Sequence, residues 1–240
     1  MPKYKQTTSL TNIKRIGVYI GVPGLGDLLF IIPLFRALKE RFPEAETVFI
    51  GKLLRGYVRP IFDACQYIDS LMEFHLYEKK SFGSLLGFSA RLRREKFDLI
   101  VDTQRKFAPS LLMKMGGPRF MVSYSSKGMF SDFEVPDSGD RSLRHTADVS
   151  LDLARALGIE PKLELCLDVP EQYQAYAAAF FGAAGIGEED PVLGIVPSAS
   201  EPTRCWPPER FAAVANQLHR AYGMTPVCLG SKADAAAIDK

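Results

Sequence analysis

The stretch that decides the fold is Lys14-Arg15-Ile16-Gly17-Val18-Tyr19-Ile20-Gly21-Val22-Pro23-Gly24-Leu25-Gly26-Asp27-Leu28-Leu29-Phe30. An apolar run leads into three glycines within six residues, and a long apolar segment continues from Asp27 to Phe42. This order predicts a buried first strand, a tight loop and a helix that carries Asp27 in its first turn. Glycine permits positive φ and close approach of a ligand, and a helix start favours anions.

Asp27 has two possible roles at that helix start. A carboxylate in the first turn can cap the helix and do nothing more. It can also act as a base beside a phosphorylated substrate held by the loop. The local sequence leaves both roles open.

Two familiar glycine motifs do not match this loop. The dinucleotide fingerprint needs G-x-G-x-x-G and an acid after the second strand, whereas these glycines run G-x-x-G-x-G and that strand ends in Gly51-Lys52. A P-loop needs Lys-Ser/Thr after its last glycine, and Asp27 stands at the lysine position.

Composition bounds the class of protein. With 240 residues, 47% of them hydrophobic and 24% charged, the chain can form one large domain or two small ones. We expect no signal peptide and no membrane span, because no apolar run approaches the roughly 20 residues required. Four widely spaced cysteines without histidine partners argue for a reducing compartment and against structural zinc, so we expect a cytoplasmic protein.

The net charge of +2 conceals an asymmetry. Residues 1–170 hold 25 lysines and arginines against 20 acids, and residues 171–240 hold 5 against 8. A basic first part suits an anionic acceptor or the surface of an anionic leaflet, and it is equally compatible with no partner at all. No nucleic-acid-binding motif is present, so we expect no nucleic-acid partner.

Strands and helices alternate beyond the first helix, which predicts a doubly wound parallel sheet. Pro33 lies deep in the first helix and predicts a kink or a late helix start. The residues Asp102 and Gln104 end a strand and are candidates for a cleft. Strands are expected at 46–51, 67–74, 97–102, 119–124 and 163–167, and helices at 53–64, 81–96, 108–115, 145–157 and 171–184. Between them, 125–144 reads as a long loop that is functional or mobile.

The helix at 81–96 has a basic face formed by Arg91, Arg93, Arg94 and Lys96. A solvated face is one explanation of it. Contact with an acceptor or a membrane is the other.

The strand pattern restarts at 191–197 and continues with a Ser/Pro loop, a helix at 208–222 and a strand at 225–229. We therefore predict an N-terminal Rossmann-like domain at 1–170 and, at 171–240, a connecting helix with the first part of a second such domain. Two strands cannot cover both faces of a parallel sheet, so we expect a chain that is the front part of a longer protein and is prone to associate.

Four segments together resemble glycosyltransferase family 9, the ADP-heptose:lipopolysaccharide heptosyltransferases and their relatives. They span residues 14 to 240 in order. The segments are Gly24-Leu25-Gly26-Asp27-Leu28-Leu29-Phe30, Asp98-Leu99-Ile100-Val101-Asp102-Thr103-Gln104, His145 before a helix ending Leu157-Gly158-Ile159, and Arg204-Cys205-Trp206-Pro207-Pro208-Glu209-Arg210-Phe211-Ala212 followed by Leu229-Gly230-Ser231 and Asp234.

The resemblance implies a GT-B fold with two Rossmann-like domains. It also implies an inverting, metal-independent transfer of a heptose or related sugar from a nucleotide sugar, ADP-linked in this family, to a lipopolysaccharide core or other glycan acceptor. No cofactor or metal is expected, and the chain contains no Asp-x-Asp pair to hold a metal on a diphosphate. Contact with the inner membrane would be peripheral.

Site residues follow from the same resemblance. Asp27 would be the general base that takes the acceptor proton. The sugar-nucleotide side would use Gly24, Gly26, Ser198, Ser200, Arg204 and Asp234, with Arg204 where the family has lysine. Gln104 and Lys106 would lie on the acceptor side. Trp206 is expected to pack, and His145 to be structural.

Departures from the family leave alternatives open. Arg105 replaces a glycine, and Ala108 and Pro109 stand where later acceptor-side residues are expected, which leaves the acceptor unidentified. The family's Asp-Ser/Thr-Gly-x-x-His segment is not in this sequence, so we expect weak donor binding. The alternatives are a truncated or degenerate non-catalytic relative that binds a sugar nucleotide or a partner without turnover, and a sugar-nucleotide epimerase, which would need a glutamate or histidine pair beside Asp27.

Overall fold

The computed structural model describes residues 10–53, 59–74, 82–124, 129–135, 143–165, 167–199, 202–230 and 234. The chain divides into two compact units, Met1–Asp168 and Val169–Lys240. Ser200, residues 54–58 of the helix expected at 53–64, and most of the loop expected at 125–144 lie outside the described residues.

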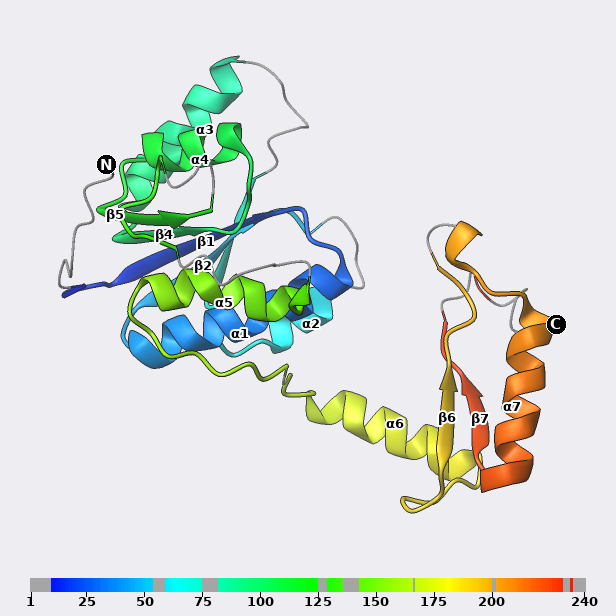
Figure 1. Cartoon of the computed structure of the whole chain (residues 1–240). Coiled ribbons are helices and arrows are strands. Elements are labelled where there is room, and N and C mark those ends of the chain that lie inside the picture. The colour runs from blue at the N-terminus through cyan, green and yellow to red at the C-terminus, as the bar shows by residue number, and fades with distance from the viewer. Residues whose placement is uncertain are drawn as a thin grey trace. The chain divides into compact units, whose positions relative to one another are not determined.

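The first unit is built on a parallel sheet with strand order β3-β2-β1-β4-β5 (Figure 1). Its strands are β1 (Arg15–Gly21), β2 (Glu46–Gly51), β3 (Ser70–Glu73), β4 (Leu99–Asp102) and β5 (Phe120–Ser123). The chain runs outward from β1 to β3 and then returns to the other side of β1 as β4. The strand order therefore reverses between β1 and β4, where a crevice opens at the carboxyl ends of such sheets.

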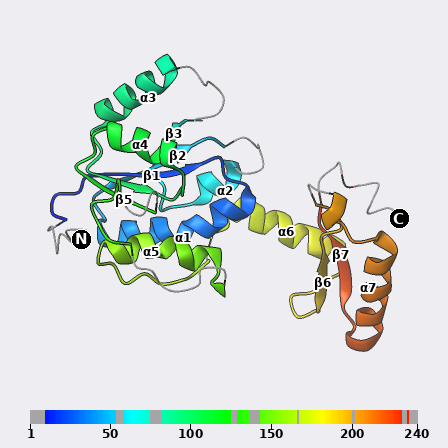
Figure 2. The same cartoon turned by 45° about the horizontal axis from the view of Figure 1, so that its top comes forward.

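Helices cover both faces of this sheet (Figures 1 and 2). One face carries α1 (Leu25–Arg41), α2 (Arg59–Ala64) and α5 (Thr146–Ala156), and the other carries α3 (Phe82–Glu95) and α4 (Phe107–Met115). Ile16 and Val18 point to the first face and Tyr19 to the second, as the two-residue period of a strand requires. The predicted doubly wound α/β sheet is confirmed.

The helix α1 is the central element of the first core. Eight of its residues are buried, and Phe35 stacks on Phe49 of β2 with ring centroids 6.3 Å apart. Each fully buried side chain of this size stabilises the fold by about 1.5–3 kcal/mol. The helix begins at Leu25 and contains Pro33, so the predicted late start is wrong.

Glycines hold the carboxyl ends of β1 and β2 together. Gly21 has φ +81°, and a Cβ added at Gly51 would lie 2.3 Å from the Gly21 carbonyl oxygen. The same oxygen accepts a hydrogen bond from Lys52 N at 2.8 Å. Larger residues would push this edge of the crevice apart.

The strand expected at 163–167 is wrong where the structure describes it. Residues 163–165 and 167 belong to no strand, and Leu163 and Leu165 are exposed. Glu164 instead accepts a hydrogen bond from Arg36 of α1, so this segment runs along the helix layer and does not join the sheet.

The second unit contains α6 (Glu171–Ala183), β6 (Val192–Ile195), a 3-10 turn (Pro202–Arg204), α7 (Pro208–Tyr222) and β7 (Thr225–Cys228). The strands β6 and β7 pair in parallel, as the restarted pattern predicts. Val192, Val196 and Leu229 are exposed. In the described ranges of both units, no helix is long and apolar enough to cross a bilayer.

Candidate active site

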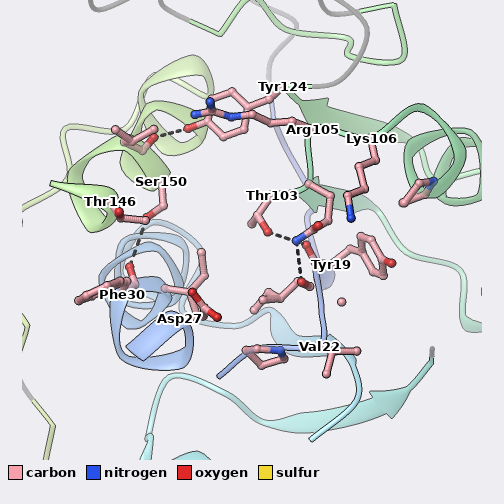
Figure 3. Close-up of a pocket in the computed structure, with 17 residues that line it drawn as sticks. Tyr19, Val22, Asp27, Phe30, Thr103, Arg105, Lys106, Tyr124, Thr146 and Ser150 are labelled. Carbon is pink, nitrogen blue, oxygen red and sulfur yellow. Dashed lines mark hydrogen bonds between the residues drawn. The ribbon is translucent and has the colours of Figure 1, made fainter. Parts of the chain in front are cut away.

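A cavity of about 630 Å³ lies at the crevice in the first unit (Figure 3). The loop from β1 to α1, the start of α1, the loop from β4 to α4, the residue after β5 and the first turns of α5 form its walls. It therefore opens where the strand order reverses, the usual place for a ligand in this fold.

Asp27 lines the cavity and is exposed. It is the third residue of α1, and its Oδ2 accepts a hydrogen bond from Gly24 N at 2.9 Å. Glycine has no side chain to complete a capping box, so this bond is the cap. In the described part of the chain nothing is bonded to Oδ1. A carboxylate has lone pairs to spare, so capping leaves Asp27 able to accept a proton.

Gly24 and Gly26 lie at the same helix start but are not among the residues that line the cavity. Of the three loop glycines only Gly21 has a positive φ, so it is the only one of the three whose backbone conformation favours glycine. A Cβ at Gly26 would meet only Phe30 Cε2, at 3.9 Å, which is an ordinary contact. The fold does not require glycine at position 26.

Gln104 forms part of the opposite wall. Its Nε2 donates to Ile20 O at 2.7 Å, and Thr103 Oγ1 donates to Tyr19 O at 3.0 Å (Figure 3). These bonds tie the loop after β4 to the end of β1. Both side chains line the cavity.

Two cations follow in the same wall. Lys106 is exposed and is the N-cap residue of α4, and the Arg105 guanidinium lies 5.3 Å from the centroid of the Tyr124 ring. Arginine over an aromatic face is attracted by the ring quadrupole. Tyr124 in turn donates a hydrogen bond to Val149 O of α5. The cavity thus has one carboxylate on α1 and two cationic side chains in the loop before α4.

Asp102 does not lie in the cleft, so that expectation is wrong. It is fully buried beneath the loop, because it follows Ile100 on the face of β4 that packs toward α4. Burial raises the pKa of its carboxyl to about 6, against opposing hydrogen bonds from Ser110, Gln104 N and Ser123.

Helix α5 supplies the remaining wall through Thr146 and Ser150. His145 caps this helix, its Nδ1 accepting from Ala147 N at 3.2 Å, which fits the expected structural role. Buried Asp152 accepts hydrogen bonds from Arg144 and Arg155, both at 2.8 Å. This ion-pair cluster fixes the start of α5 beside the cavity.

Sequence reasoning missed several lining residues. Tyr124 directly follows β5, so the rule that selected Gln104 would also have selected it. Arg105 was noted as a departure from the family, and its place in the wall is a finding of the structure. Thr146 and Ser150 carry no sequence signal, because the fold alone brings α5 to this crevice.

In the second unit, the predicted site residues follow β6 or β7 in the chain. Ser198 follows β6 and is half-buried, Arg204 ends the 3-10 turn and is exposed, and Asp234 is half-buried. Trp206 packs edge-on against Phe211 with centroids 5.1 Å apart, which agrees with the expected packing role. That Asp27 and Arg204 share one cleft stays a prediction.

The chemistry of the lining narrows the alternatives. Among the described residues no three His, Cys, Asp or Glu side chains gather as a metal site, and the residues that line the cavity include neither glutamate nor histidine. The glutamate or histidine pair that an epimerase would need is therefore not found beside Asp27 in this cavity.

Comparison with known proteins identifies the family. The model of glycosyltransferase family 9 (heptosyltransferase) matches residues 86–240. The chain belongs to glycosyltransferase family 9. The resemblance drawn from the four sequence segments is thereby confirmed.

Individual relatives agree with this family 9 assignment. The chain is 24% identical to lipopolysaccharide heptosyltransferase 3 of Escherichia coli over 227 aligned residues. The aligned region covers 90% of this chain and 64% of that relative. It superposes on the family 9 glycosyl transferase of Veillonella parvula with a TM-score of 0.71 at 22% identity, covering 94% of this chain and 65% of that one.

For ADP-heptose lps heptosyltransferase II of Escherichia coli the TM-score is 0.65 at 20% identity, and the superposition covers 95% of this chain and 67% of that one. The predicted GT-B fold class is confirmed by these two structures. The family 9 chain spans 64% of the length of the curated relative.

Proposed function

We propose that this protein is a glycosyltransferase that moves a heptose or related sugar from an ADP-sugar to a lipopolysaccharide core acceptor. Family membership and the relatives' names support the reaction class. The observation that carries the proposal is the Asp27 carboxylate, held by Gly24 N through Oδ2 while it lines a cavity at the strand reversal.

In the proposed step, Asp27 takes the proton from an acceptor hydroxyl as that oxygen attacks the anomeric carbon. The new carbon–oxygen bond forms as the bond to the diphosphate breaks, and its electron pair leaves with the nucleotide. Attack from the face opposite the diphosphate inverts the anomeric centre. Base catalysis of this kind contributes about 10²–10⁴-fold in rate.

The leaving diphosphate needs cations and hydrogen-bond donors. Arg204 supplies the charge in this proposal, Ser198 and Ser200 supply hydroxyls, and the backbone at Gly24 and Gly26 lets the phosphates approach the start of α1. Asp234 would contact the ribose. The reaction then needs no metal ion, and Gln104 and Lys106 orient the acceptor.

A peripheral contact with the cytoplasmic face of the inner membrane is the second part of the proposal. Arg91, Arg94 and Lys96 are exposed at the end of α3, and exposed Phe107 and Leu111 lie one turn apart on α4. Exposed cations attract an anionic leaflet, and exposed apolar side chains can enter its surface. Co-sedimentation of the full-length protein with phosphatidylglycerol vesicles, and none with phosphatidylcholine vesicles, is the expected result.

The test of the activity is a transfer assay on the full-length protein with ADP-heptose and a truncated lipopolysaccharide core. We expect ADP release, a mass increase of one heptose on the acceptor, an inverted anomeric configuration by NMR, and no loss with EDTA. The non-catalytic alternative predicts calorimetric binding of the ADP-sugar without any product.

A further inference from the structure

Asp102 is a buried acid that the proposed reaction does not use. Its exposure is 0%, and in the described ranges it forms no ion pair. Buried Asp152, by contrast, is paired with Arg144 and Arg155. A buried carboxylate without a cation costs stability, so stability alone does not explain an acid at position 102.

The hydrogen bonds of Asp102 join three elements at the cavity. Its Oδ1 accepts from Gln104 N at 2.9 Å, and its Oδ2 accepts from Ser123 Oγ of β5 at 2.9 Å and from Ser110 Oγ of α4. Ser110 Oγ also lies 3.1 Å from Lys106 O. Gln104 N is thus bound directly to the carboxyl, and the single hydrogen of the Ser110 hydroxyl can go either to that carboxyl or to Lys106 O at the other end of the segment 103–106.

Segment 103–106 forms one wall of the cavity, since all four of its residues line it. We propose that Asp102 is a positioning residue of the acceptor site, which holds this segment so that Gln104 and Lys106 meet the acceptor that Asp27 deprotonates. The inference rests on the proposed function, because it assigns the cavity to the acceptor.

The arrangement also makes the wall sensitive to protonation. While Asp102 is ionised, both serine hydroxyls donate to it. When Oδ2 takes a proton it becomes a hydrogen-bond donor, Ser110 Oγ accepts that hydrogen bond, and the Ser110 hydroxyl hydrogen turns to Lys106 O. Because burial raises the pKa of Asp102 to about 6, the two forms exchange near pH 6.

The elements around this part of the sheet carry other charged or titratable groups, and in the described ranges no ion pair joins any of them to Asp102. They are Tyr19 on β1, Asp27 on α1, Arg91, Arg93, Arg94 and Glu95 on α3, Arg105 and Lys106 before α4, Lys114 on α4 and Asp132 after β5. Lys114 and Asp132 pair with each other at 2.9 Å. A change in acceptor KM near pH 6 is therefore attributed to Asp102 only if substitution at position 102 abolishes it.

The experiment measures acceptor KM, sugar-nucleotide KM and kcat of the full-length protein from pH 5 to 8 for wild type and Asp102→Asn. In wild type we expect the acceptor KM to change across pH 6. In Asp102→Asn we expect that transition to vanish. The acceptor KM at pH 7.5 should rise about fivefold, which corresponds to the net contribution of one hydrogen bond. The sugar-nucleotide KM should stay within about twofold.

Asp98→Asn is the matched control. Asp98 precedes the amino end of the same strand and accepts hydrogen bonds from Lys14 N and Arg15 N, so its loss tests a backbone-bonded carboxyl away from the cavity. An unchanged acceptor KM and pH profile is expected there. An Asp102→Asn enzyme with the wild-type pH profile would overturn the proposal.

Hydrogen exchange separates this inference from the proposed function. Backbone amides of 104–107, corrected for intrinsic rates, should change protection across pH 6 in wild type and not in Asp102→Asn. If wild type shows no transfer, the proposed function fails, and the exchange result still decides whether Asp102 holds the segment 103–106. Equal exchange in both proteins at every pH would reject it.

Discussion

Replacing Gly26 by alanine separates the needs of the fold from the needs of the ligand. Gly26 is the second residue of α1, and a methyl group there meets only Phe30 Cε2, at 3.9 Å. Alanine is favoured over glycine by up to about 1 kcal/mol inside a helix, and by less in the first turn. We therefore expect Gly26→Ala to raise stability by about 0.5 kcal/mol, which is about 1–2 °C in Tm.

Activity should move in the opposite direction. If phosphates of the sugar nucleotide approach the backbone at this helix start, the methyl group occupies their space. We expect kcat/KM for the nucleotide sugar to fall at least about tenfold, which is about 1.4 kcal/mol of transition-state binding. The acceptor KM should be unaffected.

The assay pairs thermal unfolding with steady-state transfer kinetics on the full-length protein. Gly87→Ala is the matched control, because Gly87 is exposed in helix α3 and a Cβ there meets nothing within 4 Å. It should gain similar stability and keep wild-type kinetics. A Gly26→Ala protein with wild-type kcat/KM would refute the role of this backbone, and a loss of stability would refute the steric reasoning.

Three further predictions concern stability. Asp152→Ala should lower the free energy of unfolding in urea by about 3 kcal/mol, because it leaves Arg144 and Arg155 without their buried partner. Asp63→Ala removes an exposed ion pair and should lower it by under about 0.5 kcal/mol. Equal losses in the two variants would contradict the argument. Gly51→Ala should destabilise by more than about 2 kcal/mol because its Cβ would lie 2.3 Å from a backbone oxygen, and a neutral result in urea would show that the edge can relax. Hydrogen bonding from Arg155 lowers the pKa of Asp148, so its stabilisation is present above the unfolded value of 3.8 and is lost as pH falls through the lower folded value. Thermal unfolding between pH 5 and 2 should show a smaller pH dependence in Asp148→Asn than in wild type, and parallel curves would rule this out.

Much of the first unit could be predicted because its signals are local. The apolar run before Gly21 and the amphipathic segment after Asp27 specify β1 and α1 without knowledge of the rest. The place of Asp27 in the first helical turn follows from the same pattern. Four ordered segments were enough to suggest the family, although single motifs of this length are weak.

The wrong predictions concern positions whose structure depends on packing between segments that are distant in the sequence. Whether Asp102 faces the crevice or the core depends on which side of β4 meets α4, and strand-end position alone does not give it. The segment 163–167 has a strand-like composition, yet Glu164 is bonded to Arg36 on the helix layer. Arg105 and Tyr124 meet only because β4 and β5 are neighbours in the sheet.

The most direct measurement is transfer by Asp27→Asn at saturating acceptor and nucleotide sugar. Asparagine keeps an oxygen to accept the Gly24 N–H, so unfolding temperature and calorimetric binding of the ADP-sugar should stay close to wild type. The account predicts a kcat lower by about 10²–10⁴-fold in this folded, binding-competent protein. A kcat within a few-fold of wild type would contradict it and return Asp27 to the role of a helix cap.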